Sequence, residues 1–163
     1  MLVAISLPVH GFADETQKHV SPDGKLEAFV IPVGKPGDFA MESRVEIRDS
    51  KGKIVFAKSF ASKDGEHGYI VYHADWTPDS RFFVFSVYSS GGHQPWNSPI
   101  YFYCRSDGQL RLLDQYLKPV RDPHFGLSPP DIIRAPILKE YGDLESVTID
   151  VKLSNLVKQK PKR

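Results

Sequence analysis

The sequence predicts an all-β fold of antiparallel, propeller-blade-like sheets, with two clear repeated units and a degenerate C-terminal segment. The first observation is a turn that occurs twice, 56 residues apart, as Ser21-Pro22-Asp23-Gly24 and Thr77-Pro78-Asp79-Ser80. A repeat of about this length is typical of propellers and related arrays. Thirteen Pro and twelve Gly also suit short strands joined by turns and would interrupt long helices. The aromatic content of 12% is the third observation, because aromatic residues favour strands.

Alternating apolar residues and turn signals predict where the strands lie. The expected strands cover residues 25–33, 44–48, 53–60, 69–76, 81–89, 99–105, 109–115 and 145–153. Residues 81–89 are apolar on both faces, which is typical of a strand that is covered on both sides. Each unit therefore runs turn, strand, loop, strand, Gly turn, strand. The strand over 69–76 lies between the two units, as an innermost blade strand would.

A third and altered copy of the turn follows at Ser128-Pro129-Pro130-Asp131, 51 residues beyond the second copy. A second Pro replaces the Asp of the motif there. We favour a short helix capped by Ser128, or an irregular segment, and Pro136 would keep such a helix short. A true strand that starts a third sheet is the alternative.

The repeat resembles a known family at the turns and at the strands that follow them. The residues that carry the resemblance in the second unit are Trp76-Thr77-Pro78-Asp79, Ile100-Tyr101-Phe102, Asp107-Gly108, Leu110, Leu112 and Leu113. With the first copy of the turn, they look like a TolB-like, Pro-Asp-type β-propeller repeat over about residues 16–116. Val20 stands where the family usually has Trp, and Ser80 stands where it usually has Gly. The resemblance implies blade-like sheets and, often, export; it implies little about activity.

The chain is too short for a complete propeller of this kind. A closed propeller needs at least four blades, and the sequence supplies two units and part of a third. Three arrangements are open: a sheet pair capped by the C-terminal segment, a ring of several chains, and a fragment of a longer propeller. We favour the first.

The residues that define the repeated turn are expected to be scaffold. Pro22 and Pro78 restrict the backbone, while Asp23 and Asp79 can accept hydrogen bonds from nearby backbone N–H groups. Cys104, the only cysteine, shares a predicted strand face with other apolar residues, so we expect a small buried hydrophobe and not a nucleophile.

The two ends of the chain differ from its body. Residues 1–13 are apolar and end in Gly11-Phe12-Ala13, as a secretory signal would, although the usual basic segment is missing. We therefore expect a periplasmic or secreted protein whose mature chain starts at Asp14; a buried first strand is the alternative. Residues 14–154 form the expected domain, and residues 155–163 a basic, disordered tail. The net charge of +1 and the absence of a basic, aromatic surface argue against nucleic acid as a partner.

The best candidate binding loop lies between the strands over 81–89 and 99–105. It contains His93, Gln94, Trp96 and Asn97, beside paired Gly residues. Trp96 could stack on a sugar or anchor a protein partner, and the other three side chains could form hydrogen bonds. The alternative is that Trp96 folds back over the core.

A polar cluster on the strand over 69–76 is the second candidate. His73 and Asp75 share the alternation of Tyr69 and Val71, and His67 could join them from the start of the strand. Such groups can hold zinc or act as an oriented base. A His–Asp hydrogen bond that ties the strand to its turn is the interpretation we favour.

Taken together, the sequence predicts an exported, non-catalytic binding or interaction domain. Its partner would be a protein, or a small ligand such as a carbohydrate, and an oligomer is possible. No cofactor and no transmembrane segment are expected. The alternative is a small metal-dependent or carbohydrate-processing enzyme that uses His67, His73 and Asp75. The sequence has no Gly-x-Ser-x-Gly elbow, phosphate-binding Gly loop or His-Glu-x-x-His motif.

Overall fold

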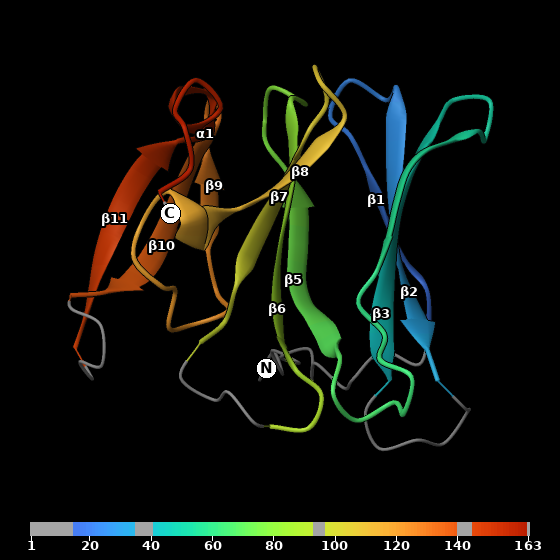
Figure 1. Cartoon of the computed structure of the whole chain (residues 1–163). Coiled ribbons are helices and arrows are strands. Elements are labelled where there is room, and N and C mark those ends of the chain that lie inside the picture. Colours follow the sequence, from blue (N-terminus) through green and yellow to red (C-terminus); the bar gives the residue numbers. More distant parts are fainter. Residues whose placement is uncertain (1–14, 35–40, 93–96, 140–144, 163) are drawn as a thin grey trace, which may run out of the picture.

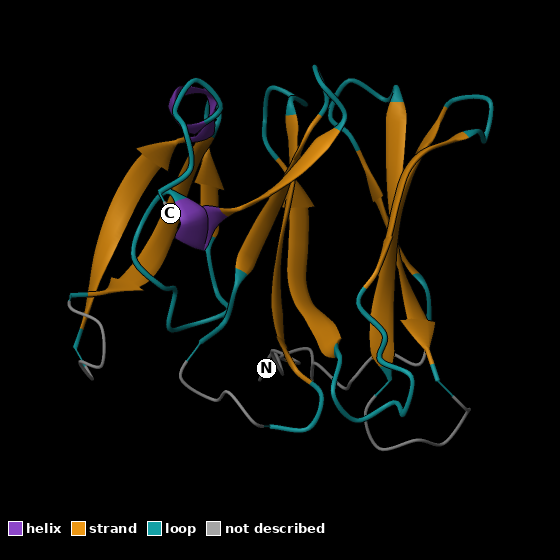
Figure 2. Cartoon of the chain, in the orientation of Figure 1, coloured by secondary structure: helices purple, strands orange, loops and turns teal. Residues whose placement is uncertain are grey.

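The protein is a stack of three antiparallel sheets, which stand side by side in the computed structural model (Figure 1). The structure describes residues 15–34, 41–92, 97–139 and 145–162. Strands dominate the described chain, and the only helical segments within it are very short (Figure 2). The predicted all-β class is therefore confirmed, and none of the three sheets formed by the described residues closes into a barrel.

The first sheet has four strands in sequence order: β1 (Gln17–Val20), β2 (Leu26–Val33), β3 (Glu42–Asp49) and β4 (Ile54–Ser59). The Pro-Asp turn joins β1 to β2 and a Gly turn joins β3 to β4. A β1 strand before the turn was not among the strands that the sequence predicts.

The second sheet repeats this order with β5 (Tyr69–Trp76), β6 (Phe82–Ser89), β7 (Ile100–Cys104) and β8 (Gln109–Leu112). The strand over 69–76 thus begins the second sheet and is the counterpart of β1. The predicted strand over 109–115 ends early, because its last three residues form a 3-10 turn, η1 (Leu113–Gln115).

The third sheet corrects the favoured interpretation of the C-terminal segment. It consists of β9 (Gly126–Ser128), β10 (Ile132–Leu138) and β11 (Ser146–Lys152), in the order β11-β10-β9. The expected short helix after Ser128 is wrong, since Ile133, Ala135 and Ile137 alternate toward the core as a strand requires. A short helix, α1 (Leu153–Leu156), follows β11 where the other two sheets have their fourth strand.

The predicted disordered tail is also wrong for the residues that the structure describes. Leu156 is 3% exposed and Val157 packs against the same core. Further on, the backbone N–H of Lys162 donates to the carbonyl of Gln115 in η1 (2.7 Å). Residues 155–162 therefore dock on the domain, because the apolar residues after β11 supply the side chains that a fourth strand would have placed there.

Two hydrophobic cores hold the three sheets together, and β6 contributes to both. Phe83 and Phe85 are fully buried in the core between the first and second sheets. Phe82 and Val84, on the other face, are buried in the core between the second and third sheets. The prediction that this strand is covered on both sides is confirmed. Cys104 is 2% exposed in the second of these cores, as expected of a small buried hydrophobe.

The repeated turns share one hydrogen-bond pattern. In the first, the Ser21 hydroxyl donates to Asp23 (2.8 Å) and accepts from the backbone N–H of Leu26 (3.0 Å). In the second, the Thr77 hydroxyl donates to Asp79 (2.8 Å) and accepts from the N–H of Phe82 (3.1 Å). Both carboxylates also accept a backbone N–H two residues on, from Lys25 and Arg81 respectively. Asp23 and Asp79 thus make the contacts expected of scaffold residues; Pro22 and Pro78 precede them in each turn.

The turns of neighbouring sheets are also linked to one another. The N–H of Asp23 donates to the Ser80 hydroxyl (3.0 Å), and the N–H of Asp79 donates to the carbonyl of Pro130 in the third turn (3.2 Å). Arg105 forms an ion pair with Asp23 at 2.6 Å, which fastens the β7–β8 turn to the first sheet. This end of the stack is therefore a row of connected turns.

No helix among the residues that the structure describes is long and apolar enough to cross a membrane.

Candidate functional site

The candidate binding loop lies largely outside the described residues. His93, Gln94 and Trp96 fall in that part of the chain, and only Asn97 of the four predicted residues is described. The side-chain oxygen of Asn97 is buried and has no hydrogen-bond partner among the described residues.

Both flanks of this loop are fastened to the scaffold. On one side, the backbone N–H of Ser90 donates to the carbonyl of Gly68 (3.0 Å), and its hydroxyl donates to the carboxylate of Glu42 (2.7 Å). On the other side, the N–H of Ser98 donates to the carbonyl of Val120 (2.9 Å). The loop thus starts and ends at positions that the fold holds in place.

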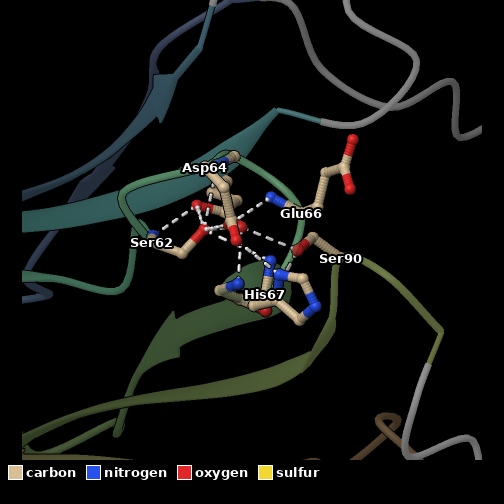
Figure 3. A network of polar contacts seen from close by, with 8 residues as sticks. Ser62, Asp64, Glu66, His67 and Ser90 are labelled. Atoms are coloured by element: carbon tan, nitrogen blue, oxygen red, sulfur yellow. Dashed lines mark hydrogen bonds and ion pairs between the residues drawn. The ribbon is translucent and has the colours of Figure 1, made fainter.

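The carboxylate of Glu42 organises the network on the Ser90 side. Glu42 opens β3 and is 1% exposed, yet it accepts the N–H groups of Ser62 and Gly68 at 2.5 Å each. Burial raises the pKa of Glu42, but the hydrogen bonds from Ser90, Ser62 and Gly68 outweigh that effect and hold the pKa below its usual value. In Figure 3, Ser62 from the β4–β5 loop and Ser90 from the end of β6 lie on opposite sides of this network.

Gly68 is required at its position because of this network. A Cβ atom there would lie 2.6 Å from a carboxylate oxygen of Glu42 and would overlap the carbonyl oxygen of Phe60. The close approach lets the N–H of Gly68 reach the buried carboxylate. We call Glu42 together with Ser62, Gly68 and Ser90 the Glu42 cluster. Its hydrogen bonds connect the first sheet, the β4–β5 loop and the candidate loop.

His67 is bonded to the Glu42 cluster and does not belong to the predicted cluster on β5, because its backbone N–H donates to the Ser62 hydroxyl. Its Nδ1 lies 2.6 Å from a carboxylate oxygen of Asp64, and the two side chains point toward one another in Figure 3. The hydrogen bonds from Glu66, Ser62 and His67 hold the pKa of Asp64 well below its usual range.

The prediction that His67, Tyr69, Val71, His73 and Asp75 share one face is wrong, because β5 contains a β-bulge. The register with β6 shifts between Val71 and His73. Tyr69 and Val71 therefore face the first sheet together with Ala74 and Trp76. His73 and Asp75 face the other side. Among the described residues there is no group of three or more His, Cys, Asp or Glu that could hold a metal ion.

The bulge residue itself, Tyr72, takes part in a second set of polar contacts, which we call the inner edge: Tyr72, His124 and Asp122. The Nε2 of His124 lies 3.1 Å from the Tyr72 hydroxyl, and its Nδ1 lies 2.5 Å from a carboxylate oxygen of Asp122. The ring of His73 lies 4.4 Å from the ring of Phe125, centroid to centroid. The inner edge thus joins the first strand of the second sheet to the segment that leads into the third.

His19 on β1 contacts β5 from the first sheet. The indole N–H of Trp76 donates to the backbone carbonyl of His19 (3.0 Å). Burial lowers the pKa of His19; the charge of Asp75 opposes this effect and His73 reinforces it, so the pKa stays below the usual value. The imidazole is therefore neutral at pH 7.

Sequence reasoning missed Tyr72, Asp122 and His124. Tyr72 and His124 are 52 residues apart, and their contact depends on a bulge that alternation does not reveal. The short spacing in Asp122-Pro123-His124 is the only local signal, because Asp122 also accepts the backbone N–H of His124 (2.8 Å).

Neither a protein-family model nor a curated protein matches the chain, so the residues and their geometry carry the functional argument.

Proposed function

We propose that the protein is an exported, non-catalytic binding or interaction domain whose partner is a protein or a small ligand such as a carbohydrate. The observation that carries this proposal is the fixed attachment of the candidate loop. Ser90 is bonded to Glu42 and Gly68, and Ser98 is bonded to Val120. A loop held at both flanks by a rigid scaffold is a common way to present binding groups.

Within the loop, we assign the anchor role to Trp96 and hydrogen-bonding roles to His93, Gln94 and Asn97. A Trp ring supplies a large apolar surface together with one N–H donor, which suits both a sugar face and a protein pocket.

The export part of the proposal rests on the signal-like residues 1–13. The resemblance to propeller repeats also belongs to this proposal; three antiparallel blade-like sheets with linked Pro-Asp turns support it. Geometry does not support a metal-dependent enzyme built on His67, His73 and Asp75, because His67 pairs with Asp64 in the β4–β5 loop and the described residues contain no group of three or more His, Cys, Asp or Glu that could hold a metal ion.

A pull-down from periplasmic extract tests the binding role. We expect the wild-type protein to retain a partner that Trp96→Ala loses, because the variant lacks the stacking surface. Trp96→Phe keeps an aromatic face and is the matched control that should retain most of the partner. Equal recovery with Trp96→Ala would contradict the role assigned to the loop.

Fluorescence gives an independent check on Trp96, because the chain has two Trp residues and Trp76 is 3% exposed. The difference between the wild-type and Trp96→Ala spectra isolates the Trp96 emission. A solvent-exposed, red-shifted emission is expected of a binding loop; a blue-shifted emission would mean that Trp96 covers the core.

A further inference from the structure

We propose that the Tyr72 hydroxyl is an acyl-acceptor site, which takes the acyl group of a neutral carboxylic ester with His124 as its base and Asp122 as a positioning residue. The site goes beyond the proposed binding function and uses none of the residues of the 93–97 loop. Each chain accepts one acyl group, so this is a modification site that requires no turnover. Three observations carry it: a continuous chain of contacts, the direction of its hydrogen bonds, and the exposure of its side chains.

The side chains of the inner edge form one chain of contacts. The Tyr72 hydroxyl lies 3.1 Å from Nε2 of His124, and Nδ1 of the same ring lies 2.5 Å from a carboxylate oxygen of Asp122. A hydroxyl within hydrogen-bond reach of an imidazole that a third group orients is the arrangement that activates a nucleophile. The separation of Tyr72 and His124 lies within that reach.

The charge of Asp122 sets the direction of these hydrogen bonds. Burial raises the pKa of Asp122, but the hydrogen bonds from the backbone and the ring of His124 outweigh that effect and hold the pKa below its usual value. The carboxylate is therefore ionised at pH 7 and can only accept, so Nδ1 carries the proton. In the neutral imidazole Nε2 is then an acceptor, and the Tyr72 hydroxyl donates to it. The phenolic proton thus already faces the base that removes it.

Contacts on both sides hold the two rings in this relation. The Tyr72 ring lies edge-on to His124 (4.9 Å between centroids, 79° between planes) and edge-on to Tyr88 (5.9 Å, 76°). Asp122 also accepts the backbone N–H of His124 (2.8 Å), which keeps the carboxylate beside the imidazole. The contact with Tyr88 explains where the Tyr72 ring lies, but it does not explain why the hydroxyl meets an oriented imidazole.

The exposure of the three side chains argues against a purely structural tie. Tyr72 is 42% exposed, and the side chains of His124 and Asp122 are 69% and 54% exposed. Exposed polar contacts of this kind contribute little to the free energy of unfolding, because water competes for the same groups. The same exposure lets a donor molecule approach the inner edge from solution.

The charge of the inner edge favours a neutral acyl donor over a phosphoryl donor. Asp122 is ionised, and in the part of the chain that the structure describes no Lys or Arg forms an ion pair with it. Phosphoryl transfer depends on cationic groups around the transferred phosphate, and the carboxylate would repel such a donor. An ester of an uncharged acid meets no such repulsion.

The reaction balances with the ester as its only reactant. The Tyr72 oxygen forms a bond to the ester carbonyl carbon while Nε2 of His124 takes the phenolic proton. The bond from this carbon to the leaving oxygen then breaks, and the proton passes from Nε2 to that oxygen. The products are a tyrosyl ester and one alcohol.

The test treats the full chain with p-nitrophenyl acetate, a neutral ester with a coloured leaving group. Peptide mass spectrometry follows the acetyl occupancy of Tyr72 over time. Hydroxylamine cleaves a tyrosyl ester and leaves acetyl-lysine intact, so it identifies the bond that has formed. We expect Tyr72 to acquire an acetyl group that hydroxylamine removes.

Variants of each side chain locate the base and its positioning residue. His124→Gln keeps a polar group but removes the base, so it should slow the acetylation of Tyr72 at least about tenfold. Asp122→Asn removes the charge that selects the tautomer and should slow it at least about threefold, whereas Asp122→Glu keeps the charge and should recover most of the rate. Tyr72→Phe keeps the ring and should lose the hydroxylamine-sensitive acetyl group. Glu27→Gln, which removes the partner of Lys18 on the first sheet, should react at the wild-type rate.

Equal acetylation of Tyr72 in the wild type and in His124→Gln would overturn the assignment, because Tyr72 would then react as an ordinary exposed phenol. An unmodified Tyr72 in the wild type would overturn it too. Thermal melts verify that each variant is folded, and the Asn and Glu variants of Asp122 decide the matter if His124→Gln does not fold. Trp96→Ala should react as the wild type does. Loss of the acyl-acceptor site therefore leaves the binding function standing, and loss of the Trp96-dependent partner leaves this site standing.

Discussion

At the scale of single residues, Ser80 stands where the repeat motif usually has Gly, and its side chain has a structural role. Ser80 has φ of +63°, a left-handed conformation that favours Gly, and it is the only non-Gly residue with positive φ in the described chain. Its hydroxyl accepts the N–H of Asp23 from the first turn. The side chain that strains the backbone therefore links two sheets, which a Gly could not do.

Replacing Ser80 tests this balance of strain and linkage. Ser80→Ala keeps the backbone strain, loses the hydrogen bond and should lower the free energy of unfolding by about 1–2 kcal/mol. Ser80→Gly also loses the bond but relieves strain of about 1 kcal/mol, so it should cost less than the Ala variant. Urea unfolding measures both, with the exposed Ser146→Ala as control. If Gly proves as destabilising as Ala, strain at Ser80 is not significant.

At the scale of elements, the third sheet has three strands, and a short helix follows where the other two sheets have a fourth strand. β11 is followed by α1, whose Leu153 is fully buried in the core between the second and third sheets. Asp131, from the third turn, accepts the backbone N–H groups of Leu153 and Ser154. The turn that starts the sheet therefore also positions the helix that ends it.

Leu156 provides the test of this element. Leu156→Ala should lower the free energy of unfolding by about 2–4 kcal/mol, because the side chain is 3% exposed and its removal leaves a cavity. Asn155→Ala, at an exposed position of the same helix, is the control and should change little. Chemical denaturation measures the free energy of unfolding of both variants. If residues 155–162 were disordered, neither substitution would change it.

At the scale of the whole molecule, the two outer faces of the stack carry paired charged groups. On the first sheet, the carboxylate of Glu46 is bonded to Arg44 and Arg48 at 2.7 Å each. On the third sheet, Arg134 holds Asp150 through two hydrogen bonds of 2.7 Å. Both groups alternate with residues that point into the cores, so they lie on the outward faces.

These faces predict a monomer. Packing another sheet on these faces would bury charged groups, and the desolvation cost would offset much of the gain from contact. Analytical ultracentrifugation should therefore show a single species of about the 18.4 kDa chain mass. A sharp trimer or tetramer would instead favour a ring of chains.

The local pattern of the sequence was sufficient for the all-β class, most strand positions, the two-sided burial of β6 and the buried Cys104. These features depend on alternation and turn chemistry, which neighbouring residues determine. Only the tertiary structure decided the third sheet, the docked residues 155–162 and the bulge that places His73 on the opposite face of β5 from Val71. Each depends on contacts between distant segments: α1 is stabilised by a core that it helps to fill, and the bulge at Tyr72 coincides with its contact to His124. The doubled Pro-Asp turn therefore predicted the repeated architecture, while the inner edge required the folded chain.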